Sequence, residues 1–310
     1  MDTGRAADSE TGHRIAVFGH ANMEVVITVG RFPVTYEPDR TLPPGAIHVG
    51  VSGTAWNVGT ALWRLGNRVD LCVSHADDPV GAFVTASQPA SPRLRIIPAP
   101  IGSQPVTAVL LGSSGERLIL NDYRTADDWH HDPGHAASIA RGADLVVLPL
   151  GRANTRLAAR AADFGVPVAC DVHAIPGPYG DHEVFCQAAD ILFMSDERLQ
   201  VPAADWLEQV MNRWPCTIAI LSQGAQGATM AVRGDSSLHH VPAAHTGPVT
   251  STLGAGDALC AGFLDGHTRG LPPRNALQRA TIFAAAKLSH IGGSQGHLTA
   301  TELDYLDADP

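Results

Sequence analysis

The sequence has few cysteines, few aromatic side chains and few charged residues. Its cysteines are odd in number and widely spaced, with no Cys-x-x-Cys pair, which excludes a disulfide framework and a zinc ribbon; they are Cys72, Cys170, Cys186, Cys216 and Cys260. No apolar run approaches the length of about 18 residues that a membrane span requires, so we expect no membrane partner. The formal charge of −10, without any run of lysine or arginine, argues against a nucleic-acid partner.

The chain nevertheless has enough apolar material to fold. A hydrophobic fraction of 45% is too high for a disordered protein, and 310 residues can bury one large core. Residues 1–13 are polar and lack the apolar centre of a secretory signal, so we expect them to form a disordered tail. The expected compartment is the cytoplasm.

Short β-rich runs alternate with helical patterns along most of the chain. Apolar runs such as VVLPL and IAIL are typical of strands that are buried on both faces, so the sequence predicts an α/β fold with a mostly parallel sheet between two helical layers. The expected strands are Arg14–Phe18, Arg68–Ser74, Asp144–Pro149, Val166–Asp171, Asp190–Met194 and Thr217–Ser222. The expected helices are Thr54–Leu65, Asn154–Phe164, Ala203–Arg213, Ala255–Thr268 and Asn275–Ser289.

Two β-rich segments, about residues 24–51 and 105–122, interrupt this alternation. The first has strand-like residues, prolines and glycines but no helical pattern. The second contains TAVLLGSSGERLIL, which predicts a hairpin with a Ser-Ser-Gly turn. We expect a single domain over residues 14–310, in which these segments form a small β-sheet lid.

The most specific motif is Gly254-Ala255-Gly256-Asp257, a loop of small residues before a helical run. Free N–H groups and the positive end of the helix dipole make such a loop suitable for an anion such as phosphate. A carboxylate beside that anion, here Asp257, can accept a proton from an attacking hydroxyl. By itself, the string is also compatible with an ordinary glycine-rich turn.

Three weaker motifs lie at other strand ends. Asn22 and Glu24 follow the first strand, and Asn57 lies in the segment Ser52–Asn57 that begins a helix; their side chains can bind neighbouring hydroxyl groups. Asn57 can equally be a capping or surface residue. The third motif, Ser222–Gly227, is a glycine-rich turn directly after an apolar strand.

Taken in order, these four segments resemble the ribokinase-like (PfkB) family of carbohydrate and nucleoside kinases over about residues 14–297. The resemblance implies a three-layer α/β/α sandwich that transfers the γ-phosphoryl group of ATP, with Mg²⁺, to a primary hydroxyl of a sugar. It implies that Asp257 is the base and that the amides of Gly254, Ala255 and Gly256 hold the developing charge. It further implies that Asn22, Glu24, Gly53 and Asn57 bind the sugar, and that Ser222, Gly224, Gly227, Thr252 and Asp171 lie near the nucleotide.

The sequence departs from the family pattern at several positions. Glu24 replaces an aspartate, and Ser52 replaces the first glycine of a pair. Ser251 replaces an aspartate that helps to hold potassium in some members, so a requirement for K⁺ stays open. Arg198 replaces a glutamate that acts near magnesium; Asp196 and Glu197 are weak substitutes, and no metal ligand is assigned.

Several alternatives remain open at this stage. A nucleoside kinase of the same family needs an aromatic wall, for which Phe32, Tyr36 and Tyr123 are candidates. A catalytically inactive sugar- or nucleotide-binding regulator is compatible with the altered Arg198. An exposed lid edge favours a homodimer that pairs through the lid. We expect the histidines of WHHDPGH (residues 129–135) to lie in an exposed loop, because Pro133-Gly134 breaks a helix.

Overall fold

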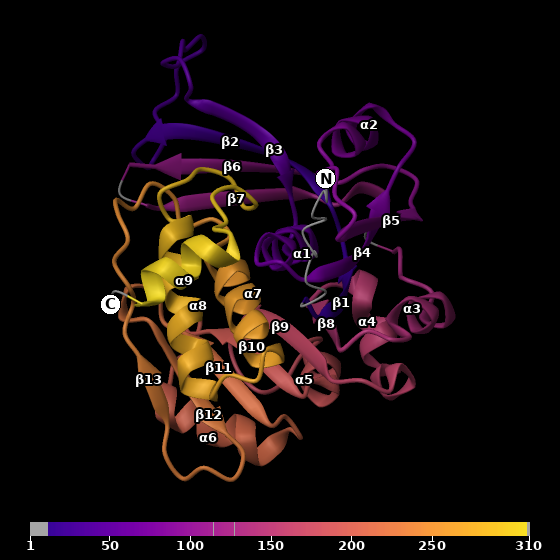
Figure 1. The fold of residues 1–310 in the computed structure, drawn as a ribbon. Helices are drawn as coiled ribbons and strands as arrows, with labels where there is room; N and C mark the ends of the chain where they lie inside the picture. Colours follow the sequence, from indigo (N-terminus) through magenta and orange to yellow (C-terminus); the bar gives the residue numbers. More distant parts are fainter. Residues whose placement is uncertain (1–11, 114, 127, 309–310) are drawn as a thin grey trace, which may run out of the picture.

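The computed structural model describes residues 12–113, 115–126 and 128–308 (Figure 1). The expected disordered tail therefore lies almost entirely outside the described residues. A nine-stranded sheet crosses the molecule in the order β13-β12-β11-β10-β9-β8-β1-β4-β5. β12 pairs antiparallel with both of its neighbours, β11 and β13, and all other neighbouring strands pair in parallel. The strands are β1 (Arg14–Gly19), β4 (Arg68–His75), β5 (Leu94–Pro100), β8 (Leu145–Pro149), β9 (Val168–Ala174), β10 (Ile191–Ser195), β11 (Ile218–Ser222), β12 (Ala228–Val232) and β13 (His239–Val241).

Helices cover both faces of this sheet. Alternate side chains of β1 show why its run is wholly apolar: Ile15 and Val17 join one buried cluster, whereas Ala16 and Phe18 join the other. The first cluster takes side chains from α1 (Thr54–Arg64), α2 (Pro79–Ala86), α7 (Ala255–Thr268), α8 (Pro273–Lys287) and α9 (Ala300–Ala308). The second takes them from α3 (Pro133–Ala140), α4 (Arg152–Ala158), α5 (Glu183–Ala188) and α6 (Ala203–Arg213). The predicted three-layer sandwich is confirmed.

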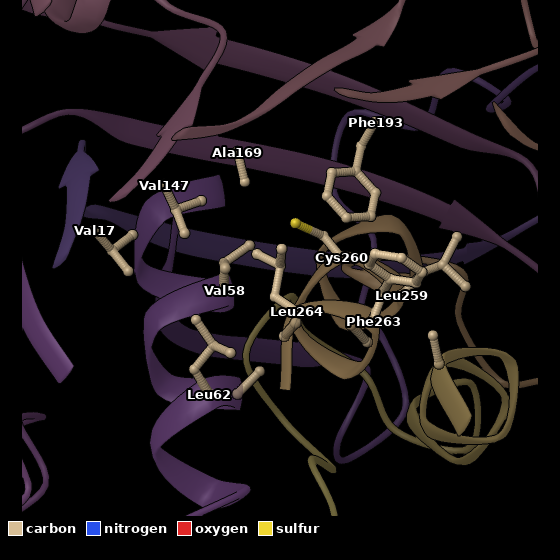
Figure 2. Packing of buried hydrophobic residues seen from close by; sticks show 14 of the residues in the cluster. Val17, Val58, Leu62, Val147, Ala169, Phe193, Leu259, Cys260, Phe263 and Leu264 are labelled. Atoms are coloured by element: carbon tan, nitrogen blue, oxygen red, sulfur yellow. The ribbon is translucent and has the colours of Figure 1, made fainter. Parts of the chain in front are cut away.

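The first cluster also fixes the position of α7. Figure 2 shows Val17, Val147 and Phe193 of the sheet facing the side chains of α1 and α7. Those helical side chains include Val58 and Leu62 from α1 and Phe263 and Leu264 from α7, all buried. Burying an aliphatic or aromatic side chain of this size contributes about 1.5–3 kcal/mol. The hydrophobic core therefore sets where the N-terminal ends of both helices lie, and those ends carry the predicted motifs.

A second sheet has the strand order β3-β2-β6-β7 (upper left in Figure 1). It consists of β2 (Asn22–Gly30), β3 (Ile47–Ser52), β6 (Val106–Gly112) and β7 (Arg117–Asp122). β6 and β7 are the predicted hairpin, although Ser114 in its turn lies outside the described residues. Both β-rich insertions therefore contribute to one small sheet, whose role as a lid stays a prediction.

The expectation of an exposed loop for the histidine-rich segment is wrong at His131, which is buried, and at Pro133, which begins a helix. Pro133 does not break a helix but begins α3, where its fixed φ and missing N–H cost nothing, and Asp132 caps that helix by accepting from the His135 N–H at 2.7 Å. His131 is 4% exposed, and its Nε2 lies 3.2 Å from the Gly19 carbonyl oxygen. Burial lowers the pKa of His131 to about 3, so this imidazole is neutral.

Two boundaries also differ from the prediction. The predicted helix Asn154–Phe164 is α4 followed by a short 3₁₀ turn, η2 (Ala161–Phe164). The strand expected to end at Asp171 continues to Ala174, so Asp171 lies inside β9. The pairing of β9 with β10 shifts register just beyond it, and this irregularity lets the strand continue.

All five cysteines are buried and free, in agreement with the expected absence of a disulfide framework. Within the described ranges, none of the helices combines the length and apolar character that crossing a membrane requires.

Candidate active site

The predicted residues gather along one edge of the large sheet. The parallel strands β11, β10, β9, β8 and β1 are consecutive neighbours, so their carboxyl ends lie side by side. Ser222 ends β11, Asp196 follows β10, Asp171 lies near the end of β9 and Asn22 follows β1. Ligands of α/β sheets bind at such an edge. The order of strands therefore separates Ser222 from Asn22 and puts Asp171 between them.

Asp257 lies in the first turn of α7 and contacts Asn57 of α1. The Nδ2 of Asn57 donates a hydrogen bond of 2.7 Å to Oδ2 of Asp257. Ser52, at the end of β3, supports Asn57 through its hydroxyl at 3.3 Å. Asn57 is buried, whereas Asp257 is only partly buried. The hydrogen bond from Asn57 thus fixes one carboxylate oxygen of Asp257, while the rest of the carboxylate remains accessible to a ligand.

The loop before α7 needs its glycine. Gly254 has φ +73°, in the left-handed region, and a Cβ there would collide with the carbonyl oxygen of Gly293. Gly256 is exposed, and Gly254 and Ala255 are partly exposed, so an anion can approach this backbone. The Ala255 N–H donates to the Thr252 carbonyl at 3.3 Å, a long bond that leaves it only weakly engaged.

The electrostatic surroundings make Asp257 a stronger base than an ordinary aspartate. Burial of the carboxylate is the largest cause that raises its pKa, the charges of Asp171 and Glu24 act in the same direction, and the resulting pKa is about 6. The hydrogen bond from Asn57 and the imidazole of His173 act in the opposite direction. A base whose pKa lies near neutrality is both ionised and able to bind a proton.

Asn22, Glu24 and Gly53 lie on the side of the small sheet. A Cβ at Gly53, which has φ +108°, would lie 2.7 Å from Oδ1 of Asn22. The Nδ2 of Asn22 donates to the Thr107 hydroxyl at 3.0 Å, and Oε1 of Glu24 accepts from the Gly293 N–H at 2.8 Å. Both side chains are buried. Polar groups from two strands of the small sheet therefore meet the N-terminal end of α1.

The turn after β11 lies at the opposite end of this sheet edge and contains Ser222, Gly224 and Gly227. The carbonyl of Ser222 accepts from the Asp196 N–H at 3.1 Å, which joins the turns after β10 and β11. Gly224 and Gly227 have φ of +54° and +96°, and a Cβ at Gly227 would collide with the Val241 carbonyl. The turn can therefore be built only with glycine at position 227.

Sequence reasoning missed Arg117, which joins the small sheet to both halves of the site. Arg117 lies at the start of β7; one guanidinium nitrogen donates to the Thr252 hydroxyl at 2.6 Å and another to the Glu197 carboxylate at 2.9 Å. Nothing in the hairpin pattern distinguished this arginine from a solvated one.

Gly293 and His173 were missed as well. Gly293 lies after α8 and contacts Glu24 and Gly254, as described above. His173 has a positive φ of +55°, uncommon for a histidine, and its N–H donates to Asp171 at 2.9 Å. The glycine pair in IGGSQG was the only available signal for the first, and no signal was available for the second.

The described residues contain no group of three or more histidine, cysteine, aspartate or glutamate side chains that could hold a metal on its own. Mg²⁺ in phosphate-transferring sites is usually held by one or two carboxylates together with phosphate oxygens. Asp196 and Glu197 are adjacent, and the pKa of Asp196 is raised by burial and by the charge of Glu197. The Glu197 carboxylate is already paired with Arg117, so a cation bound between the two carboxylates would compete with that ion pair.

Comparison with known proteins identifies the family of the chain. The sequence profile described as pfkB family carbohydrate kinase matches residues 13–300. The chain is 30% identical over 278 residues to the acarbose 7(IV)-phosphotransferase of Actinoplanes sp., covering 87% of this chain and 90% of that protein. It is 29% identical over 306 residues to the ATP-dependent ribose-1-phosphate kinase of Halopiger xanaduensis, covering 95% and 97%.

Solved structures show the same fold. The microbiome-derived acarbose kinase Mak1 superposes with a TM-score of 0.85 at 20% identity, covering 96% of this chain and all of that one. The ribokinase of Arabidopsis thaliana, solved in complex with ribose and ATP, superposes with a TM-score of 0.76 at 18% identity, covering 96% and 100%.

Proposed function

Because the chain belongs to the pfkB family of carbohydrate kinases, we propose that it transfers the γ-phosphoryl group of ATP to a primary hydroxyl of a sugar or sugar derivative. The observation that carries this proposal is the position of Asp257 between the Gly254–Gly256 loop and Asn57. A proton acceptor and an anion site then lie on the same helix turn.

In the proposed reaction, Asp257 accepts the proton of the sugar hydroxyl as that oxygen attacks the γ-phosphorus. The bond from the phosphorus to the bridging oxygen breaks, and ADP leaves with the electron pair. The amides of Gly254, Ala255 and Gly256, together with the positive end of α7, stabilise the charge on the transferred group. The pKa of about 6 keeps Asp257 ionised at neutral pH while it remains basic enough to take the proton.

The strand order supports the placement of the two substrates. We assign the nucleotide to the β10–β11 end, near Ser222, Gly224 and Gly227, with its phosphates toward Thr252 and Asp171. The sugar lies at the β1 end, where Asn22, Glu24, Gly53 and Asn57 bind its hydroxyls. Asp257 lies between the two ends, as an in-line transfer requires.

The small sheet acts as the lid in this proposal. Arg117 connects it to Thr252 in the phosphate loop and to Glu197 in the nucleotide half. A lid held in this way excludes water, which competes with the sugar as acceptor. Mg²⁺, when bound, would neutralise phosphate charge; Asp196 is the first candidate to hold it, and Glu197 could do so only by giving up its ion pair with Arg117.

Two classes of acceptor are considered, sugars and nucleosides. The two relatives act, by their names, on acarbose and on ribose-1-phosphate, so oligosaccharide-like and phosphorylated sugars belong in the test. A nucleoside is the second candidate because aromatic rings border the sugar end. The ring of His20, just before Asn22, lies 6.4 Å from Tyr123 and 5.5 Å from Trp129. Such rings can stack on a base or on the face of a sugar.

The deciding experiment measures ADP release from Mg·ATP with monosaccharides, acarbose-type oligosaccharides, sugar phosphates and nucleosides. Turnover with one class identifies the acceptor. Asp257→Asn should lower kcat by about a hundredfold to ten-thousandfold, the usual contribution of a general base. Asp205→Asn is the matched control, because Asp205 is exposed in the first turn of α6, away from this site. ATP binding without turnover on any class would favour the inactive regulator.

We also propose that two copies pair through the outer face of the lid. Directly paired residues of neighbouring strands share a face, and one row across the sheet is Val49, Val25, Ala108 and Leu120. The next row is Ile47, Ile27, Leu110 and Leu118. At both edges these side chains are exposed, Ile47 and Val49 by 55% each. A second copy of the same apolar face would bury this surface.

A further inference from the structure

Lys287 is the only lysine among the 310 residues; the other twenty basic side chains are arginines. It is the last residue of α8 and is 0% exposed. Lysine is rarely fully buried unless its charge is compensated. A protein that uses arginine everywhere else therefore has its single ammonium group in the interior, next to the candidate active site.

The contacts of Lys287 connect it to the phosphate loop. Its Nζ donates to the carbonyl of His290 at 3.1 Å, within the turn of residues 288–293 that follows α8. At one end of this turn, the Leu288 carbonyl accepts from Thr250 N at 2.7 Å and from Ser251 N at 3.0 Å. These two residues begin the loop that leads to Gly254. The ammonium group of Lys287 thus stabilises the 288–293 turn, and the start of the phosphate loop is hydrogen-bonded to that turn.

The other end of the same turn reaches the sugar side. The Gly293 N–H donates to Glu24, and the Gly293 carbonyl packs against Gly254. A displacement of the 288–293 turn would therefore move the phosphate loop and Glu24 together. Misplacing reacting groups by about 1 Å typically slows a transfer about a hundredfold.

The surrounding charges require a cation at this position. Burial lowers the pKa of Lys287 to about 8, and the carboxylates of Glu24 and Asp257 raise it against that effect. The ammonium is consequently charged at neutral pH. The imidazole of His297 adds no competing charge, because burial first, and then the charges of Lys287, Arg64 and His290, lower its pKa to about 3.

We propose that Lys287 is a positioning residue, a built-in cation that holds the 288–293 turn against the phosphate loop and makes the transfer independent of added monovalent cations. The inference rests on the proposed function, since the loop that it positions is the phosphate loop of that reaction.

The first test compares wild type, Lys287→Met and Lys287→Ala in buffers containing only tetramethylammonium, then with potassium or ammonium chloride at constant ionic strength. Wild-type kcat should not respond to either ion. Lys287→Met, neutral and of similar length, should lose about tenfold to a hundredfold in kcat. Lys287→Ala leaves room for an ion, so potassium or ammonium should restore part of its rate. Wild type that potassium stimulates severalfold, or Lys287→Met with unchanged kcat, would overturn the proposal.

A second measurement does not depend on turnover or on folding of the lysine variants. Protein labelled with ¹⁵N-lysine gives a single side-chain amine signal, whose titration reports the charge of Lys287. In Glu24→Gln the pKa of this amine should fall, because the Glu24 carboxylate raises it. An amine that titrates like free lysine in both proteins would contradict the inference. If wild type phosphorylates no acceptor, the proposed function fails, whereas this titration still shows separately whether Lys287 is a buried cation that interacts with Glu24.

Discussion

Asn57 and Asp257 are 200 positions apart in the sequence and are joined by a hydrogen bond of 2.7 Å. The amide holds the carboxylate of the proposed base from the N-terminal turn of α1, while burial raises the pKa of that carboxylate to about 6. The hydrogen bond and the raised pKa can each be changed by a separate mutation.

The pH dependence of kcat/KM should therefore show an acidic limb near pH 6. Below the pKa of Asp257 the carboxyl is protonated and cannot accept the proton of the hydroxyl, so activity falls as the pH falls. Asn57→Leu removes a hydrogen bond that lowers this pKa, and the limb should move to higher pH. Asp171→Asn removes a charge that raises it, and the limb should move to lower pH. Rate profiles from pH 5 to 8 check both shifts; movement of both in one direction would disprove the assignment.

Glu24 should determine acceptor affinity rather than the rate of transfer. Glu24→Asp withdraws the carboxylate by one methylene from the Gly293 N–H and from the sugar side. We expect KM for the acceptor to rise about tenfold, the equivalent of one hydrogen bond of about 1.4 kcal/mol, with KM for ATP unchanged. Separate titrations of the two substrates test this. An equal rise in both constants would show that the turn after α8 had moved instead.

Arg117 should couple the lid to catalysis. Arg117→Met removes its hydrogen bonds to Thr252 and Glu197; both contacts are exposed to solvent, where each contributes about 1 kcal/mol or less. We expect kcat/KM to fall about tenfold and ATP hydrolysis without acceptor to increase, because the site admits water. Arg160→Met is the control, since Arg160 pairs with Asp163 on the surface. Unchanged hydrolysis would argue against a closing role.

The homodimer prediction depends on the outer face of the small sheet. Ile47→Asp with Leu118→Asp introduces charges at both edges of this face, where the native side chains are exposed. Sedimentation should show a dimer for wild type and a monomer for the double variant. Val201→Asp, at an exposed apolar residue before α6, should leave the dimer intact. Monomeric wild type at micromolar concentration would refute this arrangement.

A buried ion cluster around Asp265, near the C-terminal end of α7, should contribute to stability. Asp265 is fully buried and accepts from Arg269 at 2.9 Å and from Asn67 at 2.8 Å, and the buried Arg279 lies 3.7 Å away. Asp265→Ala leaves these donors without their acceptor, so the free energy of unfolding should fall by about 3 kcal/mol. Asp265→Asn retains one acceptor oxygen and should cost less. Denaturant titrations measure both, and equal losses would mean that the carboxylate charge is what matters.

The sequence determined the layers of the fold and pointed to most of the residues that gather at the candidate site. Apolar runs buried on both faces are typical of a covered parallel sheet, as Ile15 and Val17 against Ala16 and Phe18 illustrate. Small-residue loops before helices are local features, which is why the Gly254–Asp257 segment could be found. Local rules failed at Pro133, where the same residue that interrupts a helix also begins one, and at Asp171, where a register shift extends the strand.

Only the tertiary structure decided which distant residues meet. Arg117 reads as an ordinary hairpin arginine until the two sheets bring it to Thr252 and Glu197. Lys287 reads as the end of an alanine-rich helix until the packing of α8 against α7 buries it beside Glu24 and Asp257. Burial and charge depend on neighbours contributed by other parts of the chain, so no local pattern encodes them.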